Sequence, residues 1–287
     1  MLRRVYEAKH TKNLMMSADN ETAKAFADSW NNLPGGSVYT KAQFEEWLYP
    51  LTEKDITNKN VLEMGCGNGS LLVHIAGWKP LFLEGVDLGA SVRSAIENMQ
   101  SLDFKNWEIT QADLTQHKNN TFDIVYCIGV LHHLKNPKDG LDAIISNTKK
   151  GGKFHCWVYA KEGNTFVIWV VDPIRKVVSK FPWWVTKYFV ATPLSIPFYI
   201  YAKSLSLLKG ISFFTKFPLY EYSLWIAKRD FLFFRHVAFD QLVTPQTIYI
   251  DKKTIEEWMM SYENVDKENA YIIMRNGNSW KFGGRIK

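Results

Sequence analysis

The sequence predicts an α/β fold whose core is a doubly wound parallel sheet with helices on both faces. From residue 59 to about 160, short apolar runs typical of buried strands alternate with helical patterns. A glycine-rich turn at 65–69 follows the first run, and Asp87 ends the second. The alternation stops near residue 161 and resumes near residue 250, which indicates an insertion within one domain.

The segment before the sheet, residues 1–58, is predicted to be a helical lid. Residues 21–32 are expected to form a short helix that Pro34 and two glycines end. Residues 41–49 are expected to form a second helix, because apolar residues recur there at i, i+3 and i+4.

Five strands are predicted next, at 61–64, 81–86, 107–110, 122–127 and 153–159. Helices are predicted between them, after the glycine-rich turn up to about residue 76, at 90–99 and at 137–147. Crossovers of this length make neighbouring strands parallel. Ligands of such sheets bind beyond the carboxyl ends of the strands, beside the first one.

The insertion, residues 161–247, carries short helical patterns interrupted by prolines. Asp172, followed by proline, is expected to cap the start of one helix. A helix at 253–260 and a strand at 271–275 return the chain to the sheet. The insertion therefore interrupts a single domain that spans 59–287.

Whole-chain composition excludes several classes of protein. The chain is 46% hydrophobic and 22% charged, which is globular composition. Three cysteines cannot build a disulfide scaffold or a four-cysteine zinc site, and no metal is expected. No signal peptide is evident, and the longest uncharged run, 188–202, is too short to span a bilayer. A cytoplasmic location is expected, with attachment to a membrane surface left open.

Three acidic residues stand in register with the strand ends. Glu63 precedes the glycines, Asp87 ends the second strand, and Asp113 follows the third. An acid after the second strand suits the paired hydroxyls of a ribose. An acid after the third suits an exocyclic amine such as adenine N6. Without a Walker motif, these residues predict an adenosine site that has no phosphate clamp.

Six stretches in order carry a family resemblance: 61–69, 85–87, 112–114, 122–127, 130–134 and 151–154. With them the sequence resembles the class I S-adenosylmethionine-dependent methyltransferases, most of all the small-molecule branch of quinone and sterol methyltransferases. The resemblance implies a Rossmann-like, seven-stranded sheet with the helical insertion after the fifth strand. It also implies S-adenosylmethionine as cofactor.

The resemblance gives the matching residues their roles. Asp87 would hold the ribose hydroxyls, and Asp113 and Leu114 would frame the adenine. The expected cofactor-binding residues are Glu63, Gly65, Cys66, Gly67, Asn68, Gly69, Asp87, Leu88, Asp113, Leu114, Cys127, Ile128, Val130 and Tyr39. Tyr39 and Trp30 are expected to close over the cofactor, or else to pack the N-terminal helices on the sheet.

Two histidines follow the fourth strand. Methyl transfer needs a base only when the nucleophile arrives protonated. His132 or His133 would be such a base, or would pack the loop and line the pocket. The (Asn/Asp)-Pro-Pro-(Tyr/Phe) tetrapeptide of enzymes that methylate base amines is absent after this strand, so no nucleic acid partner is expected.

The insertion carries the net charge of the chain. Residues 165–240 contain ten Lys and Arg against four Asp and Glu, which gives +6, the value for the whole chain. Aromatic residues are also concentrated there. Three interpretations stay open: a packed lid over an apolar pocket, peripheral membrane contact through 165–240, and a homo-oligomer interface. His236 and Asp240 are expected to face the substrate.

The sequence therefore predicts a methyltransferase that acts on a small-molecule or lipid-like acceptor by in-line methyl transfer. Two alternatives stay open: a non-catalytic regulatory module that binds the cofactor, and a dinucleotide-dependent oxidoreductase.

Overall fold

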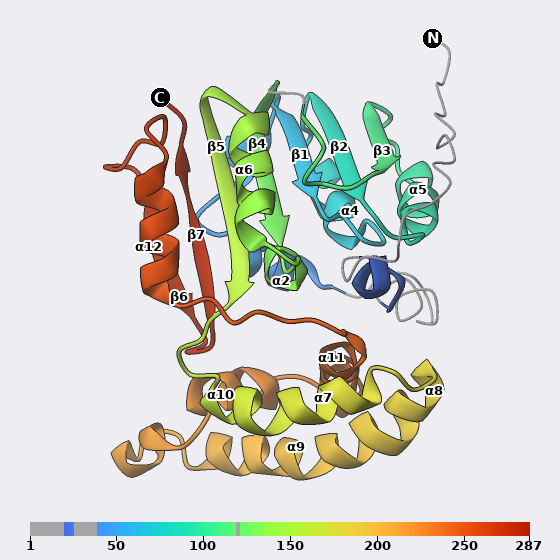
Figure 1. Ribbon diagram of the computed structural model, residues 1–287, viewed down its shortest axis with the longest axis vertical. Helices are drawn as coiled ribbons and strands as arrows, with labels where there is room; N and C mark the ends of the chain where they lie inside the picture. Colours follow the sequence, from blue (N-terminus) through green and yellow to red (C-terminus); the bar gives the residue numbers. More distant parts are fainter. Residues whose placement is uncertain (1–19, 26–38, 119–120) are drawn as a thin grey trace.

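The computed structural model describes residues 20–25, 39–118 and 121–287, and its centre is one seven-stranded sheet (Figure 1). The strand order is β3-β2-β1-β4-β5-β7-β6. The strands are β1 (Asn60–Met64), β2 (Phe82–Asp87), β3 (Trp107–Gln111), β4 (Phe122–Ile128), β5 (Thr148–Tyr159), β6 (Tyr271–Arg275) and β7 (Ser279–Arg285). Neighbours among β1 to β5 pair in parallel, whereas β7 runs antiparallel to β5 and β6. The predicted fold class is confirmed.

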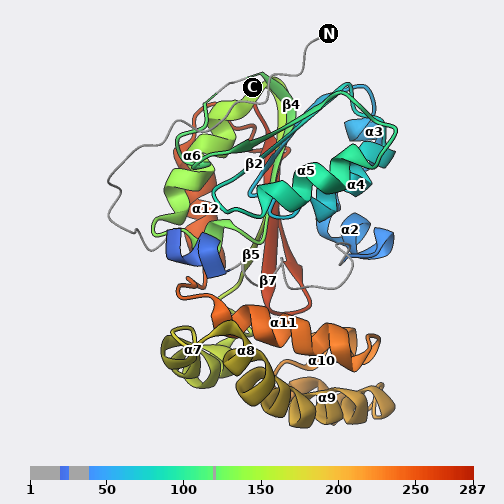
Figure 2. The ribbon, with the colours of Figure 1, turned by 90° about the vertical axis from the view of Figure 1, so that its right-hand side faces the viewer.

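Helices cover both faces of the sheet, as Figure 2 shows with the sheet seen edge-on. On one side lie α2 (Lys41–Leu48), α3 (Glu53–Ile56), α4 (Ser70–Gly77) and α5 (Val92–Gln100). On the other side lie α6 (Pro137–Asn147) and α12 (Lys252–Ser261). Local signals start these helices: the Asn136 side chain accepts from the N–H of Lys138 at the start of α6, and Thr40 and Gln43 form a capping box at α2.

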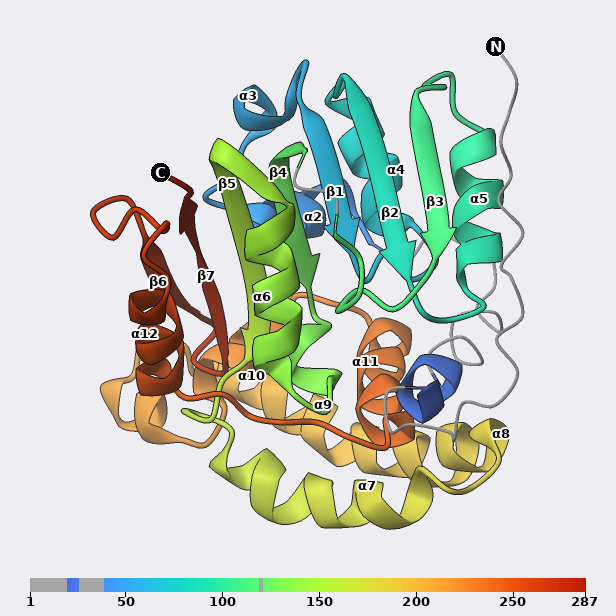
Figure 3. The ribbon, with the colours of Figure 1, turned by 45° about the horizontal axis from the view of Figure 1, so that its top comes forward.

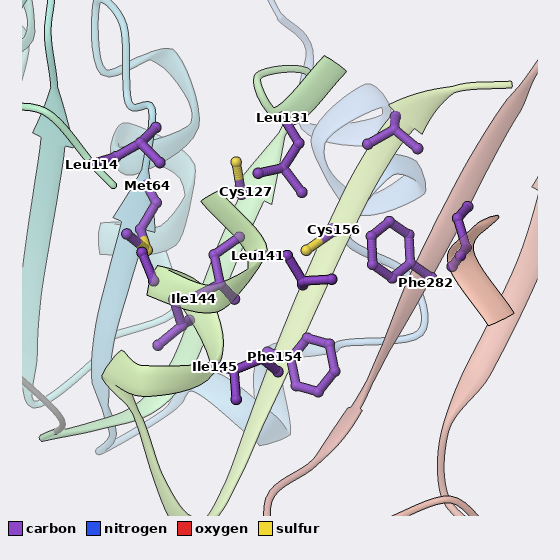
Figure 4. Packing of buried hydrophobic residues seen from close by; sticks show 14 of the residues in the cluster. Met64, Leu114, Cys127, Leu131, Leu141, Ile144, Ile145, Phe154, Cys156 and Phe282 are labelled. Carbon is purple, nitrogen blue, oxygen red and sulfur yellow. The ribbon is translucent and has the colours of Figure 1, made fainter. Parts of the chain in front are cut away.

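Two hydrophobic clusters hold these layers together. The larger lies between the sheet and α6, and Figure 4 shows Cys127, Leu141 and Phe154 packed within it. The second lies on the other face, where Phe44 of α2 and Leu72 of α4 contact the sheet. Because both faces of the central strands are covered, these strands are mostly apolar and were detectable in the sequence.

The insertion forms a separate helical layer beyond the carboxyl ends of the strands. Figure 3 shows the strand arrows of β1 to β4 directed toward it. Its helices are η2 (Val167–Val171), α7 (Asp172–Val178), α8 (Trp183–Val185), η3 (Thr186–Ala191), α9 (Thr192–Leu207), η4 (Ser212–Lys216), α10 (Tyr220–Ala227) and α11 (Phe231–Val243). Helices α10 and α11 lie between α9 and the sheet (Figures 1 and 2).

The prolines interrupt the insertion less than predicted. Helical structure precedes Asp172, so this residue caps no free helix end. Its carboxylate instead accepts a hydrogen bond from Arg175 Nη1 at 2.8 Å. Arg175 is fully buried and also donates from Nε to the carbonyl oxygen of Gln241 (2.7 Å). The expected helix start is therefore wrong: the side chain of Asp172 holds Arg175, and Arg175 ties α7 to α11.

Candidate active site

A cavity of about 260 Å³ lies at the carboxyl ends of the strands, beneath the insertion. Its walls come from the turn after β1, the ends of β2, β4 and β5, and helices α10 and α11. Thr22 and Tyr39 from the N-terminal segment also line it. The cavity therefore lies where doubly wound sheets bind their ligands.

Three glycines in the turn between β1 and α4 have backbone conformations that other residues rarely adopt, among them Gly69 with φ +75°. Gly65 has φ +88°, and a Cβ there would come within 2.4 Å of Val130 Cγ2. Gly67 has φ +52°, and a Cβ there would meet no atom within 4 Å. The backbone of Gly67 thus faces open space at the cavity wall, which leaves room for a ligand to approach it closely.

Asp87 is held in place by the backbone. Its Oδ2 accepts from the N–H of Gly67 at 2.9 Å, and its Oδ1 accepts from the N–H of Gly89 at 2.7 Å. Burial raises the pKa of Asp87 above its ordinary value, and these two N–H groups offset part of the rise. The Ser91 side chain also hydrogen-bonds this carboxylate. A carboxylate has about four acceptor sites, so Asp87 can still accept a hydrogen bond from a ligand hydroxyl.

Glu63 is a second buried carboxyl on the same wall. It is 2% exposed, and its Oε2 accepts a hydrogen bond from the hydroxyl of Tyr126 at 2.9 Å. Burial raises the pKa of Glu63 well above its ordinary value, and the negative charge of Asp87 raises it further. A cationic ligand would favour the charged form of this carboxyl.

Twelve of the fourteen expected cofactor residues line the cavity, and Gly69 and Cys127 do not. A Cβ on Gly69 would lie 2.9 Å from Ala95 Cβ, so this glycine allows α4 and α5 to pack closely. Cys127 is fully buried beneath α6. Side chains alternate along β4, so Ile128 faces the cavity and its neighbour cannot. Trp30 lies outside the described residues.

The two candidate histidines differ in their position relative to the cavity. His133 lines the cavity, whereas His132 does not. His132 is fully buried, and its Nδ1 accepts from the N–H of Tyr159 at 3.3 Å. His133 Nδ1 donates to the carbonyl oxygen of Gln246 at 2.9 Å, because a carbonyl can only accept. Burial lowers the pKa of His133 to about 4, so this ring is neutral at physiological pH.

Six aromatic residues of the cavity wall were missed in the sequence: Trp47, Trp157, Tyr159, Tyr222, Trp225 and Phe233. Trp157 and Tyr159 occupy alternate positions at the end of β5, which was the one available signal. The rings of Trp47 and Trp157 lie 6.1 Å apart and nearly parallel.

Arg275, at the end of β6, was also missed. Its guanidinium carbon lies 5.0 to 5.9 Å from the ring centres of three tryptophans on this wall. Its Nη2 donates to Glu46 Oε2 at 2.8 Å, so its charge is already paired. Arg275 thus packs against the three tryptophans and holds them in position, while Glu46 neutralises its charge.

The insertion supplies the wall opposite the glycine-rich turn: Tyr222, Trp225, Phe233, Val237, Asp240 and Gln241. Asp240 is the carboxylate of this wall. His236, one turn earlier on α11, places its Nε2 3.1 Å from Asp240 Oδ2 and does not line the cavity itself. The structure therefore brings the two predicted residues together as a pair, but only Asp240 lines the cavity.

The residues of the strand-end wall fit S-adenosylmethionine. Asp87 suits its ribose hydroxyls, the open backbone at Gly67 suits close approach, and the buried carboxyl of Glu63 suits its positive charge. Asp113 is exposed, and its Oδ1 accepts from the N–H and hydroxyl of Thr115. When bound, S-adenosylmethionine supplies an electrophilic methyl group on a sulfonium.

The family model of the methyltransferase domain matches residues 39–191, which is more than half of the chain. The chain belongs to the methyltransferase-domain family. With the fit of the site, the predicted enzyme class and cofactor are confirmed: the chain is an S-adenosylmethionine-dependent methyltransferase. The oxidoreductase alternative falls with this assignment.

Among curated proteins, the methyltransferase is similar to the tRNA U34 carboxymethyltransferases of two bacteria. The Helicobacter pylori (strain P12) protein is 32% identical over 113 residues, 38% of this chain and 43% of that protein. The Wolinella succinogenes protein is 30% identical over 122 residues, 38% of this chain and 42% of that protein. The chain thus matches less than half the length of these relatives.

Among solved structures, the methyltransferase is similar to magnesium protoporphyrin IX methyltransferase from Synechocystis PCC 6803. The form with bound SAH has a TM-score of 0.55 at 12% identity, covering 94% of this chain and 97% of that one. The form with bound SAM gives 0.53 at 12% identity, covering 96% and 100%. This likeness supports the fold.

Proposed function

We propose that this methyltransferase transfers the methyl group to a small, apolar or lipid-like acceptor bound between the strand ends and the insertion. The observation that carries the proposal is the aromatic wall of the cavity. Trp157, Trp225 and Phe233 give this wall an apolar surface, and Asp240 gives it one carboxylate. Apolar walls with few polar groups are typical of small-molecule sites.

The strand-end wall holds the cofactor in this proposal. Asp87 accepts from the ribose hydroxyls, Asp113 and Leu114 border the adenine, and Glu63 lies on the side of the methionine. The fixed position of Asp87, set by two backbone N–H groups, supports its role. Holding the donor rigidly is the main contribution of the enzyme to an in-line displacement.

The insertion wall orients the acceptor and takes its proton. Asp240 lies on the cavity and would accept the proton as the acceptor atom forms its new bond to the methyl carbon and the bond to sulfur breaks. His236 contacts Asp240 and would act through it as a positioning residue. His133 also lines the cavity, but it follows β4 on the strand-end wall, whereas Asp240 stands on the insertion wall.

A tRNA uridine is the second candidate acceptor, which the names of the matching relatives favour. That likeness covers 38% of the chain. Because the similarity to these relatives covers a minority of the chain, we give more weight to the aromatic wall, which favours the small acceptor.

The test is to incubate the purified full chain with methyl-labelled S-adenosylmethionine and either an organic-solvent extract of cells or bulk tRNA. We expect label in the extract, and loss of that label in the Asp240→Asn variant. The matched control is Glu221→Gln, a carboxylate of α10 outside the cavity lining. Label in tRNA alone would contradict the proposed acceptor class, while leaving the methyltransferase assignment intact.

A further inference from the structure

Exposed apolar side chains are concentrated on the insertion. Among the described residues, nineteen large apolar side chains are exposed, and fifteen of them lie between residues 166 and 232. The other four are scattered over the rest of the protein: Tyr49, Leu81, Met260 and Met274. We call the insertion helices from η2 to η4 the outer layer, and α10 and α11 the inner layer. The inner layer lines the cavity, so the exposed apolar surface of the outer layer needs a separate explanation.

Helix α9 is apolar on two faces. Its buried face includes Ala202 and Leu205, and the helix contacts α10 and α11. Ile196, Ile200 and Leu207 are spaced by four and seven residues, so they share a face, and all three are exposed. Leu207 is 88% exposed and Ile200 is 60% exposed. A surface helix normally turns polar residues to water, so an apolar outer face indicates a second apolar partner.

The helical run before α9 repeats this arrangement. Arg175 and Val178 of α7 are buried, whereas Trp169 and Val177 are exposed. Trp169 is 77% exposed, and Phe189 of η3 is 69% exposed. Two successive helical runs thus present aromatic and aliphatic side chains away from the protein. Such a set is too large to be the scatter of single apolar residues found on ordinary surfaces.

The exposed charges of the outer layer are positive. Lys180, Lys209 and Lys216 are exposed and form no ion pair among the residues that the structure describes. The outer layer contains a single acid, Asp172, which binds Arg175 and Lys176. Glu221 and Asp230 are exposed but belong to the inner layer. The outer layer therefore offers lysines beside apolar side chains.

We propose that the outer layer docks on the surface of an anionic lipid membrane. Apolar side chains would enter the boundary between headgroups and acyl chains, and the lysines would contact anionic headgroups. The docking that we propose is peripheral. Among the described residues no helix is both long and apolar enough to cross a bilayer.

Charge and apolarity together favour this partner over two others. A second copy of the chain, docked through the same face, would place lysines against lysines. A nucleic acid would pair with the lysines but would leave Ile200 and Leu207 uncovered by any apolar surface. A membrane with anionic lipids satisfies both parts of the surface.

The test is flotation of the purified full chain with phosphatidylcholine vesicles, with and without phosphatidylglycerol. We expect the chain to float with the anionic vesicles, and high salt to weaken that binding. The double variant Trp169→Ser, Ile200→Ser should lower binding at least about tenfold, because it removes two side chains that would enter the lipid. Lys180→Glu with Lys216→Glu should lower it on the order of fivefold per lysine.

The matched control is Leu81→Ser with Met260→Ser, which removes two exposed apolar side chains outside the insertion. This variant should float like the wild type. The proposal fails if the wild-type chain stays unbound to anionic vesicles, or if the control loses as much binding as the outer-layer variant. If the chain does not bind vesicles, either of two results would assign this surface to another partner and overturn the proposal. One is a dimer that dissociates in the Trp169→Ser, Ile200→Ser variant, and the other is tRNA binding that only the lysine variant weakens. The readout is binding, so its failure is independent of the proposed acceptor.

Discussion

The two walls of the cavity differ in what holds their functional groups. On the strand-end wall, Asp87 is fixed by backbone N–H groups of the turns after β1 and β2. On the insertion wall, Asp240 and the rings of Trp225 and Phe233 stand on α10 and α11, which are held by side chains of neighbouring helices, among them Arg175 of α7. Backbone-held groups require particular residues at particular spacings, whereas helix-borne rings can be exchanged for others of similar size. The two walls therefore differ in origin. Local backbone geometry sets the strand-end wall, which is the proposed cofactor wall, whereas packing between helices sets the insertion wall, which is the proposed acceptor wall.

The largest expected effect tests the insertion wall. Asp240→Asn should lower turnover by about a thousandfold, because the side chain can no longer accept a proton. The affinity for S-adenosylhomocysteine, measured by calorimetry, should stay unchanged. Equal loss of cofactor affinity would show that the two walls are not separate in function.

His236→Gln should shift the pH profile of turnover more than it lowers the maximum.

Acid should lower the free energy of unfolding because of the buried His155 of β5. His155 is fully buried, with Nε2 donating to the carbonyl oxygen of Trp47 and Nδ1 bonded to the hydroxyl of Tyr271. Burial lowers the pKa of His155 to about 4, below its ordinary value of 6.5. A histidine of lowered pKa stabilises the fold above its unfolded pKa and loses that effect as pH falls toward the folded value.

We therefore expect the free energy of unfolding to fall by about 3 kcal/mol between pH 6.5 and pH 4 from His155 alone. Denaturant titrations over this range would measure it. His155→Gln should give a shallower pH dependence. An unchanged dependence in this variant would show that the acid sensitivity lies elsewhere.

Asp87→Ala tests the cofactor wall directly. It removes a carboxylate that would bind the ribose hydroxyls, and charged hydrogen bonds contribute about 1.5–3 kcal/mol each. Affinity for S-adenosylhomocysteine should fall about a hundredfold by calorimetry. Asp113→Ala is the control and should fall less, because Asp113 is exposed to water. Near-normal affinity in the Asp87 variant would remove the ribose assignment.

Glu63→Gln should have opposite effects on stability and binding. Burial raises the pKa of Glu63, so its stabilising contribution is present below its unfolded pKa and is lost as pH rises through the folded pKa. The uncharged amide avoids this loss and can still accept from Tyr126. At alkaline pH the free energy of unfolding of the ligand-free variant, measured by thermal unfolding, should be about 1 kcal/mol higher than that of the wild type. The variant should nevertheless bind S-adenosylmethionine more weakly. The exposed Glu97→Gln variant should change neither quantity.

Most of the sheet and the cofactor wall could be predicted from the sequence because both are encoded locally. Strand β4 and helix α6 were predicted to within a residue, from a buried apolar run and from a proline in the first turn. The side chain of Cys127 was assigned to the wrong side of its strand. A motif gives the position of a strand, whereas the alternation along it decides which neighbour faces the cavity.

The aromatic wall of the cavity could not be predicted from local patterns. Trp47, Trp157, Trp225 and Arg275 meet around one guanidinium although they come from four distant parts of the chain. Each residue alone has the signature of an ordinary core or surface position. The insertion was predicted as broken helices, but buried Arg175 and its partners join these helices into one layer.

By itself, the sequence determined the sheet, the glycine-rich turn and the acids that follow the strands, because backbone hydrogen bonds and backbone conformations restrict residue types at nearby positions. Only the tertiary structure decided which rings and which carboxylate of the insertion line the cavity, and which apolar side chains of the insertion stay exposed. Those outcomes depend on packing between segments far apart in the chain, and packing constrains combined shape and volume more than it constrains any single residue.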